Sequence, residues 1–185
     1  MTAPLESMLV SADSHVNEPP DLWEKRLPAS MRERAPNFKK LRHREGRPPL
    51  HLSGPEAAQP RAPKPERPRG GSDQAQRLKD MALDGVIAEV LYPTSASNLF
   101  YIEDSSLQQT CIQVYNDWIS EYCQTAPDRL FGLAMVSTYD VDHAVKELLR
   151  CKKQGLRGAV IWQSPPRPIP FTSNHYDRFW AAAQD

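Results

Sequence analysis

Asp13 and His15 are residues of metal-binding type that stand two positions apart near the N-terminus, at the end of the run SMLVSAD and just beyond it. Residues 7–13 combine apolar, small and β-branched side chains, which predicts a buried strand. Because side chains two positions apart point to the same face of a strand, a carboxylate oxygen and an imidazole nitrogen could meet at one point, and both bind divalent metals. The spacing fits half of a metal site. The alternative is that Asp13 caps a turn and His15 is a hydrogen-bonded core residue.

Polar and aromatic residues follow the other expected strands, at the ends where parallel-sheet enzymes place their sites. They are Tyr92 and Thr94, Ser137 and Thr138, and Trp162 and Gln163. We expect them to surround the same opening as Asp13 and His15 and to be candidates for substrate contact, although packing or turn formation explains each equally well. Glu18 could line this opening, but an anchoring role in the turn before Pro19 is favoured.

The elements that must position these residues alternate between two periodicities. Short apolar runs predict strands at residues 7–13, 86–92, 130–136 and 158–162. Helical patterns with capping residues begin near residues 72–73, 104–105 and 140, and another helix begins near residue 176. Strands without clean polar alternation, joined by helices, predict a parallel α/β sheet that is covered on both faces. We expect the four strands to be adjacent and parallel in their sequence order.

The apolar positions of the helices predict which faces are buried. In the helix over 73–84 these positions are Ala75, Leu78, Met81 and Ala82. In the helix that begins near 104 they are Leu107, Cys111, Val114, Tyr115, Trp118 and Tyr122, and in the one that begins near 140 they are Val141, Ala144, Val145, Leu148 and Leu149. Gly85 and Gly155 are expected to end the first and third of these helices. Asn116 and Asp117 are expected to be solvated or to bond a neighbouring loop.

Residues 42–72 differ in composition from the rest and interrupt the order after the first strand. Seven of the 18 prolines lie within residues 48–68, and residues 32–72 hold eleven Lys and Arg against four Asp and Glu. Proline lacks the N–H donor that helices and central strands need, so we expect an irregular insertion over 42–72. Its PxxP motifs are typical of polyproline-II ligands, but a variable loop over the opening or at a subunit contact is favoured. His43 and His51 have no partners at metal-ligand spacing.

Composition and charge exclude several kinds of partner. The chain of 185 residues has a formal net charge of zero, so the basic field that holds a nucleic-acid backbone is absent overall. No apolar run approaches the ~20 residues that span a bilayer, and the N-terminus lacks a basic signal region, so we expect a cytoplasmic protein with no membrane partner. Three cysteines without a CxxC pairing are expected to be reduced core thiols.

Four segments carry a family resemblance through their joint order. They are SADSHVNEPPDLWEKRLP, DMALDGVIAEVLYPT, YNDWISEYCQTAPDRLFGLAMVS and GLRGAVIWQSPP. Four βα units fill roughly half of the ~250 residues of a complete (β/α)8 barrel, so size alone fits half a barrel or a small open sheet. The segments resemble the amidohydrolase-related branch of the amidohydrolase superfamily, which includes aminocarboxymuconate-semialdehyde and γ-resorcylate decarboxylases. This resemblance implies that residues 1–185 are the N-terminal half of a TIM (β/α)8 barrel domain, with 42–72 as an insertion.

The resemblance also implies a cofactor and its ligands. Asp13 and His15 occupy the positions of the family's first two ligands to a divalent metal, which is usually zinc and sometimes manganese. The further ligands, a His from strand five and an Asp from strand eight, are expected beyond residue 185, since His175 sits at a helix entrance. Tyr92, Thr94 and Trp162 are the candidate substrate-binding residues, and no catalytic residue is assigned.

The function implied by the resemblance is that of a metal-dependent hydrolase or non-oxidative decarboxylase. The substrate would be small and carboxylated, with aromatic acids among the candidates, and the metal would bind its oxygens or activate a water. We expect the site to be incomplete in this chain, so that it binds zinc poorly unless a second copy in a homo-oligomer or the C-terminal half completes it. The alternative is an inactive, truncated homologue that acts as an interaction module.

Overall fold

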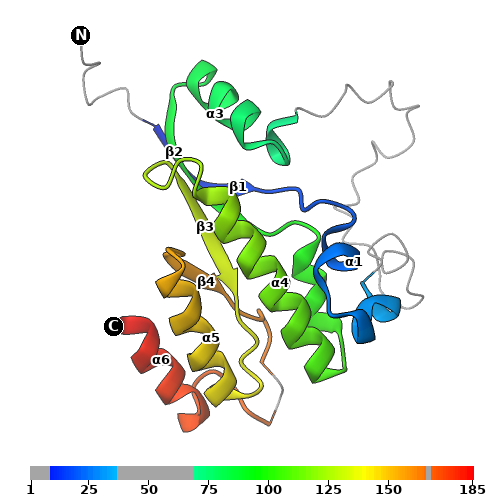
Figure 1. Ribbon diagram of the computed structural model, residues 1–185. Coiled ribbons are helices and arrows are strands. Elements are labelled where there is room, and N and C mark those ends of the chain that lie inside the picture. Colours follow the sequence, from blue (N-terminus) through cyan, green and yellow to red (C-terminus); the bar gives the residue numbers. More distant parts are fainter. Residues whose placement is uncertain (1–8, 37–68, 166–167) are drawn as a thin grey trace, which may run out of the picture.

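The computed structural model describes residues 9–36, 69–165 and 168–185, which form a sheet and its connecting helices (Figure 1). The strands β1 (Leu9–His15), β2 (Val86–Tyr92), β3 (Leu130–Met135) and β4 (Gly158–Val160) form one sheet in the order β1-β2-β3-β4. Each neighbouring pair is parallel. The predicted strand order and direction are confirmed, and the architecture is that of the N-terminal half of a (β/α)8 barrel.

Helices connect the strands where the capping residues predict them. The α-helices are α1 (Leu22–Arg26), α3 (Gln74–Leu83), α4 (Ser105–Cys123), α5 (Val141–Lys153) and α6 (Asp177–Gln184), and the 3-10 helices are η2 (Ala29–Arg34), η3 (Arg69–Gly71), η4 (Ala96–Tyr101) and η5 (Asn174–Tyr176). The side chains of Asp73, Asp104 and Asp140 cap α3, α4 and α5 by accepting backbone N–H groups. Gly85 and Gly155 follow α3 and α5 with φ angles of 70° and 93°, which would strain any other residue.

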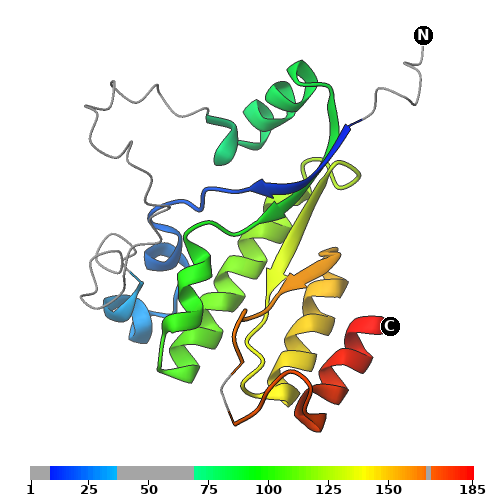
Figure 2. The same cartoon turned by 180° about the vertical axis from the view of Figure 1, so that it is seen from behind.

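The helices α4 and α5 lie on the same face of the sheet. Figure 1 shows them in front of the strands, and Figure 2, seen from behind, shows the strands in front of them. This is how consecutive units of a (β/α)8 barrel are arranged. The sequence predicted helices on both faces of the sheet, but α4 and α5 both cover the same face. In a barrel, the opposite face of each strand points toward the barrel axis and not toward a second helix layer.

The core lies between α4 and β3. All six α4 residues that the apolar periodicity predicts to face inward are buried, including Tyr115 and Tyr122. Gly132 of β3 lets the helix approach closely, since a Cβ at this position would lie 2.7 Å from Ile119 Cγ1 and 2.9 Å from Cys123 Sγ. The apolar spacing of this helix thus identifies its buried face correctly.

The predicted inner faces of α3 and α5 are only partly right. On α3, Ala75 and Ala82 are exposed, whereas Arg77 is buried. On α5, Leu149 is exposed and Glu147 is buried. Both of the unexpected buried residues are charged and form ion pairs. These charges can be buried because their ion-pair partners offset the cost of removing them from water. The spacing of apolar residues carries no information about ion pairs, so it could not predict this burial.

The first strand runs past its predicted end at residue 13. The structure describes it over Leu9–His15, so His15 as well as Asp13 lies in the strand itself, while residues 7–8 lie outside the described residues. The PxxP motifs and both histidines of the expected insertion fall within 37–68, outside the described residues. In the described ranges, no helix is long and apolar enough to cross a membrane.

The three cysteines are free and buried, as expected of core thiols. Burial raises the pKa of Cys111 to about 12 and that of Cys123 to about 11. Burial likewise raises the pKa of Cys151, and the neighbouring Glu147 carboxylate adds to the rise. These thiols therefore stay protonated near neutral pH and behave as small apolar groups.

Candidate metal centre

Asp13 and His15 point to the same side of β1 at its carboxyl end. The Oδ1 atom of Asp13 lies 3.7 Å from Nε2 of His15, and the side chains are 84% and 55% exposed. His15 is the partner of Tyr92 in the parallel pairing of β1 with β2, and the two ring centroids are 5.9 Å apart. The two side chains meet as the strand spacing predicts, and the His15 ring is not enclosed in an apolar core.

A backbone carbonyl orients the His15 ring. Its Nδ1 lies 3.1 Å from the carbonyl oxygen of Pro93, which can only accept a hydrogen bond. Nδ1 therefore carries a proton, and in the neutral ring the lone pair is on Nε2, the atom that faces Asp13. The Thr94 hydroxyl oxygen lies 3.5 Å from the same Nδ1. Metal-ligating histidines are commonly held by a carbonyl in this way, but no sequence pattern signals the contact, because the acceptor is a main-chain atom.

The two facing atoms fit a divalent cation. An ion can lie about 2.1 Å from both an oxygen and a nitrogen that are 3.7 Å apart, and this is an ordinary bond length for zinc. A lone pair directed at a carboxylate is also an arrangement in which a cation can lie between the two groups. Within the described ranges, no group of three or more His, Cys, Asp and Glu side chains could hold a metal. In these ranges, Asp13 and His15 therefore form a pair of facing groups without a third such side chain.

Glu18 joins the segment after β1 to the segment after β2. Its carboxylate accepts hydrogen bonds at 2.9, 2.9 and 3.1 Å from the backbone N–H groups of Thr94, Ser95 and Ala96. Burial raises the pKa of Glu18, and these hydrogen bonds offset part of the rise. Glu18 is an anchor, as favoured from the sequence, but the turn that it holds follows β2 and is not the one before Pro19. The same turn contains Pro93, whose carbonyl orients His15.

The remaining residues predicted at the opening lie in different environments, and Gln163, after β4, is exposed. Trp162 follows β4 and packs edge-to-face on Phe100 and Tyr101 of η4, with ring centroids 5.4 and 4.6 Å apart. Ser137 and Thr138, by contrast, are buried, with 7% and 6% exposure. The structure therefore brings Tyr92 and Thr94 beside His15, places Trp162 in an aromatic cluster, and removes the two hydroxyl residues after β3 from the candidates for ligand contact.

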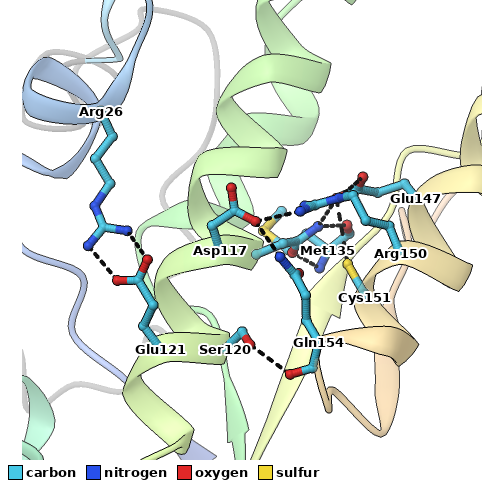
Figure 3. Close-up of polar contacts among 10 residues, drawn as sticks. Arg26, Asp117, Ser120, Glu121, Met135, Glu147, Arg150, Cys151 and Gln154 are labelled. Atoms are coloured by element: carbon cyan, nitrogen blue, oxygen red, sulfur yellow. Dashed lines mark hydrogen bonds and ion pairs between the residues drawn. The ribbon is translucent and has the colours of Figure 1, made fainter.

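A second polar cluster lies between α4 and α5 (Figure 3). Arg150 donates to both carboxylate oxygens of Glu147, at 2.8 and 2.7 Å, and also to Asp117. The buried Asn116 donates to Glu147 at 2.7 Å and exchanges two hydrogen bonds with the main chain of Met135, at the end of β3. The expectation that Asn116 and Asp117 are solvated or bond a neighbouring loop is wrong for Asn116, which is buried and bonds β3 and α5, while the partly exposed Asp117 bonds Arg150 of α5 and not a loop. The cluster fixes the strand end and is structural.

Solved structures of similar fold include decarboxylases of aromatic acids. A 2,6-dihydroxybenzoate decarboxylase from Rhizobium is 23% identical, with a TM-score of 0.58 over 95% of this chain and 46% of that one. A dihydroxybenzoic acid decarboxylase from Polaromonas sp. JS666, with bound manganese and the inhibitor 2-nitroresorcinol, is 20% identical, with a TM-score of 0.59 over 95% and 46% of the two chains. An amidohydrolase from Mycobacterium avium subsp. paratuberculosis K-10 is 15% identical, with a TM-score of 0.67 over 93% and 55%.

The chain spans about half the length of these structures. The TM-scores show a shared fold, and at identities this low the likeness shows the fold alone. No curated protein sequence matches it. The Amidohydrolase family, however, matches residues 12–185, a range that includes Asp13 and His15 and nearly all of the sheet. This match confirms the resemblance carried by the four sequence segments, and the chain therefore belongs to the Amidohydrolase family.

Proposed function

We propose that this protein is a metal-dependent decarboxylase of small aromatic carboxylates, in which Asp13 and His15 contribute two ligands of a divalent metal. The observation that carries the proposal is their geometry, with ligand atoms 3.7 Å apart and the proton of His15 held at Nδ1 by Pro93. Membership of the family supports metal dependence, and the decarboxylases of similar fold support the substrate class.

Manganese is the favoured metal, since a structure of similar fold contains it. When bound, the cation would polarise substrate oxygens and stabilise negative charge that develops on them. The chain's own contribution is a carboxylate that offsets part of the cation's charge and an imidazole whose Nε2 faces that carboxylate. Pro93 orients the ring, because its carbonyl accepts the N–H of Nδ1, the nitrogen that faces away from Asp13.

Three residues are proposed to contact the substrate. Tyr92 presents its ring beside His15, and the Thr94 hydroxyl is close enough to His15 to hydrogen-bond a group that binds there. Trp162, packed against Tyr101, offers aromatic surface on which a planar ring can stack. A carboxylated aromatic ring suits this combination, because its charged end favours a cation and its flat face favours aromatic side chains.

Manganese binding by the purified chain tests the metal assignment. Electron paramagnetic resonance of free Mn²⁺ gives the dissociation constant for the wild type and for Asp13→Asn and His15→Gln. Each substitution should weaken binding by at least about tenfold, the loss expected even for a residue that only supports a ligand. The exposed Asp142 and the neighbouring His143 on α5 provide matched controls, Asp142→Asn and His143→Gln, which should bind as the wild type does. Binding that neither β1 substitution weakens would refute the assignment.

The substrate class is tested with 2,6-dihydroxybenzoate, and resorcinol, which lacks the carboxylate, is its control. We expect 2,6-dihydroxybenzoate to tighten Mn²⁺ binding and resorcinol to leave it unchanged, because the carboxylate is the group that would reach the cation. Release of CO₂ together with resorcinol identifies decarboxylation, in which the ring-to-carboxylate bond breaks and a proton replaces the carboxylate. Equal effects of the two compounds on Mn²⁺ affinity would contradict the proposed substrate class.

A further inference from the structure

Arg77 of α3 is a buried cation that reaches the candidate metal centre from the helix layer. The residue is 7% exposed, and its Nη2 donates a hydrogen bond of 2.6 Å to the main-chain carbonyl oxygen of His15. Its Nη1 donates to the carboxylate of Glu89 on β2 at 2.5 Å. Its Nε donates to the carbonyl oxygen of Gly70 and to the hydroxyl of Tyr122, at 2.9 and 3.0 Å. One guanidinium therefore joins β1, β2, η3 and α4.

The ion pair with Glu89 keeps this guanidinium in place. The two side chains are 9% and 13% exposed, so neither charge could stay buried cheaply without the other. The guanidinium is planar and presents its donors in fixed directions, which match partners on several elements at once. A lysine at position 77 would supply the charge for Glu89, but one ammonium cannot reproduce the full set of contacts.

The pairing of β1 with β2 is irregular just before His15 and regains main-chain hydrogen bonds from Val16 to Tyr92 and from Asn17 to Gly71. Ser11 is the partner of Glu89, whereas Ser14 is the partner of Leu91, so three steps along β1 correspond to two along β2. Asp13 lies within this irregularity, and β1 is the first strand of the described sheet, paired with β2 alone. A bulged strand with one neighbour has fewer regular backbone hydrogen bonds to fix its path. The hydrogen bond from Arg77 is made to the carbonyl oxygen of His15, two residues after Asp13.

We propose that Arg77 is a positioning residue for Asp13 and His15, an inference that rests on the proposed metal site. By fixing the carbonyl of His15, Arg77 fixes the main chain from which both side chains project. The imidazole is then held from two directions, at its Nδ1 by Pro93 and at its main chain by Arg77. Without the second contact the main chain shifts, the bond to Pro93 weakens, and the 3.7 Å separation of the two ligand atoms is lost.

The substitution Arg77→Lys tests this role with two measurements. Nitrogen-15 NMR of the metal-free chain reports which ring nitrogen of His15 carries the proton, and paramagnetic resonance gives the Mn²⁺ dissociation constant. The wild type should show the proton on Nδ1. Arg77→Lys should show a mixture of the two tautomers and a dissociation constant raised about tenfold, as is typical when a residue that supports a metal ligand is removed.

Arg150→Lys is the matched control. Arg150 is also an arginine with several carboxylate contacts, to Glu147 and Asp117, but it belongs to the cluster between α4 and α5. Its substitution should lower the midpoint of thermal unfolding and leave both the His15 tautomer and Mn²⁺ binding unchanged. A general loss of stability is thereby separated from a loss of positioning.

An unchanged tautomer and an unchanged Mn²⁺ affinity in folded Arg77→Lys would overturn the proposal and leave Arg77 as a structural ion pair. Glu89→Gln is the second variant, used if Arg77→Lys does not fold: it keeps an acceptor but removes the counter-charge, and it should change the tautomer in the same direction. An unchanged tautomer there overturns the proposal as well. If Asp13→Asn and His15→Gln fail to weaken Mn²⁺ binding, the proposed function fails, whereas the metal-free tautomer still decides the role of Arg77.

Discussion

The carbonyl oxygen of Pro93 accepts a hydrogen bond from Nδ1 of His15 at 3.1 Å, across 78 positions of the sequence. The bond connects the end of β1 to the turn that follows β2. That turn is itself held by the carboxylate of Glu18, three residues after His15, through the N–H groups of residues 94–96. The two segments therefore fix each other, and the orientation of the candidate ligand depends on loop geometry as well as on the strand.

Glu18→Gln should loosen this arrangement. The carboxylate uses one oxygen for Thr94 and Ala96 and the other for Ser95, whereas an amide can accept through one oxygen only. At least one N–H then faces an NH₂ group, so we expect the free energy of unfolding in urea to fall by about 1–2 kcal/mol. The exposed Glu24 gives the control Glu24→Gln, which should cost under about 0.5 kcal/mol. Equal losses for the two variants would show that Glu18 is no anchor.

The framework of the fold could be predicted because its signals are local. Asp104 caps α4, and the apolar side chains that follow it recur at helical spacing on the buried face. Gly85 ends α3 with a positive φ angle, and the run from Val86 onward is a strand. In each case the residue type and its immediate neighbours determine the conformation, so the pattern can be read without knowledge of the tertiary contacts.

The contacts that complete the candidate site could not be predicted, because their partners are distant in sequence or belong to the main chain. Asp13 and His15 were found through strand spacing, which is local. Pro93 contributes only a carbonyl oxygen, and every residue has one. Arg77 lies next to the predicted apolar face of α3 and looks like a solvated charge until Glu89, twelve positions later on another element, is seen to neutralise it.

Asn116→Ala should destabilise the fold strongly. The side chain is fully buried and donates to the Met135 carbonyl and to Glu147, while its oxygen accepts the Met135 N–H. Alanine leaves both main-chain groups of Met135 without these partners in a buried place, and we expect a loss of about 3 kcal/mol in the free energy of unfolding. Gln113→Ala, on the same helix, is the control and should cost no more than about 0.5 kcal/mol. Similar costs would mean that water replaces the Asn116 contacts.

Glu147 should make the free energy of unfolding depend on pH in the acidic range. Burial raises the pKa of its carboxyl, but hydrogen bonds and the ion pair with Arg150, together with Asn116, outweigh burial and hold the pKa below its ordinary value of 4.5. A carboxyl with a depressed native pKa stabilises the fold above its unfolded-state pKa and loses that contribution as the pH falls through the native value. The difference in unfolding free energy between the wild type and Glu147→Gln should therefore shrink below pH 4.5.

The measurement is urea unfolding of the two proteins at several pH values on either side of 4.5. Glu121→Gln is the control, since Glu121 forms an ion pair with Arg26 in which both side chains are substantially exposed. An exposed ion pair contributes at most about 1 kcal/mol, so the free energy of unfolding of this variant should stay close to that of the wild type at every pH measured. A difference for Glu147→Gln that stays constant, or grows, as the pH falls would contradict the depressed pKa.

Gly132→Ala should weaken the packing of α4 on β3. The added Cβ would lie 2.7 Å from Ile119 Cγ1 and 2.9 Å from Cys123 Sγ, closer than carbon and sulfur atoms can approach without displacement. Overpacking of this kind costs about 1–3 kcal/mol, measurable by urea unfolding. Cys123→Ala removes one of the two obstacles, so the double variant should lose less than the sum of the single losses. Strictly additive losses would show that β3 moves away from α4 as a unit and that the close approach at Gly132 is not what fixes their separation.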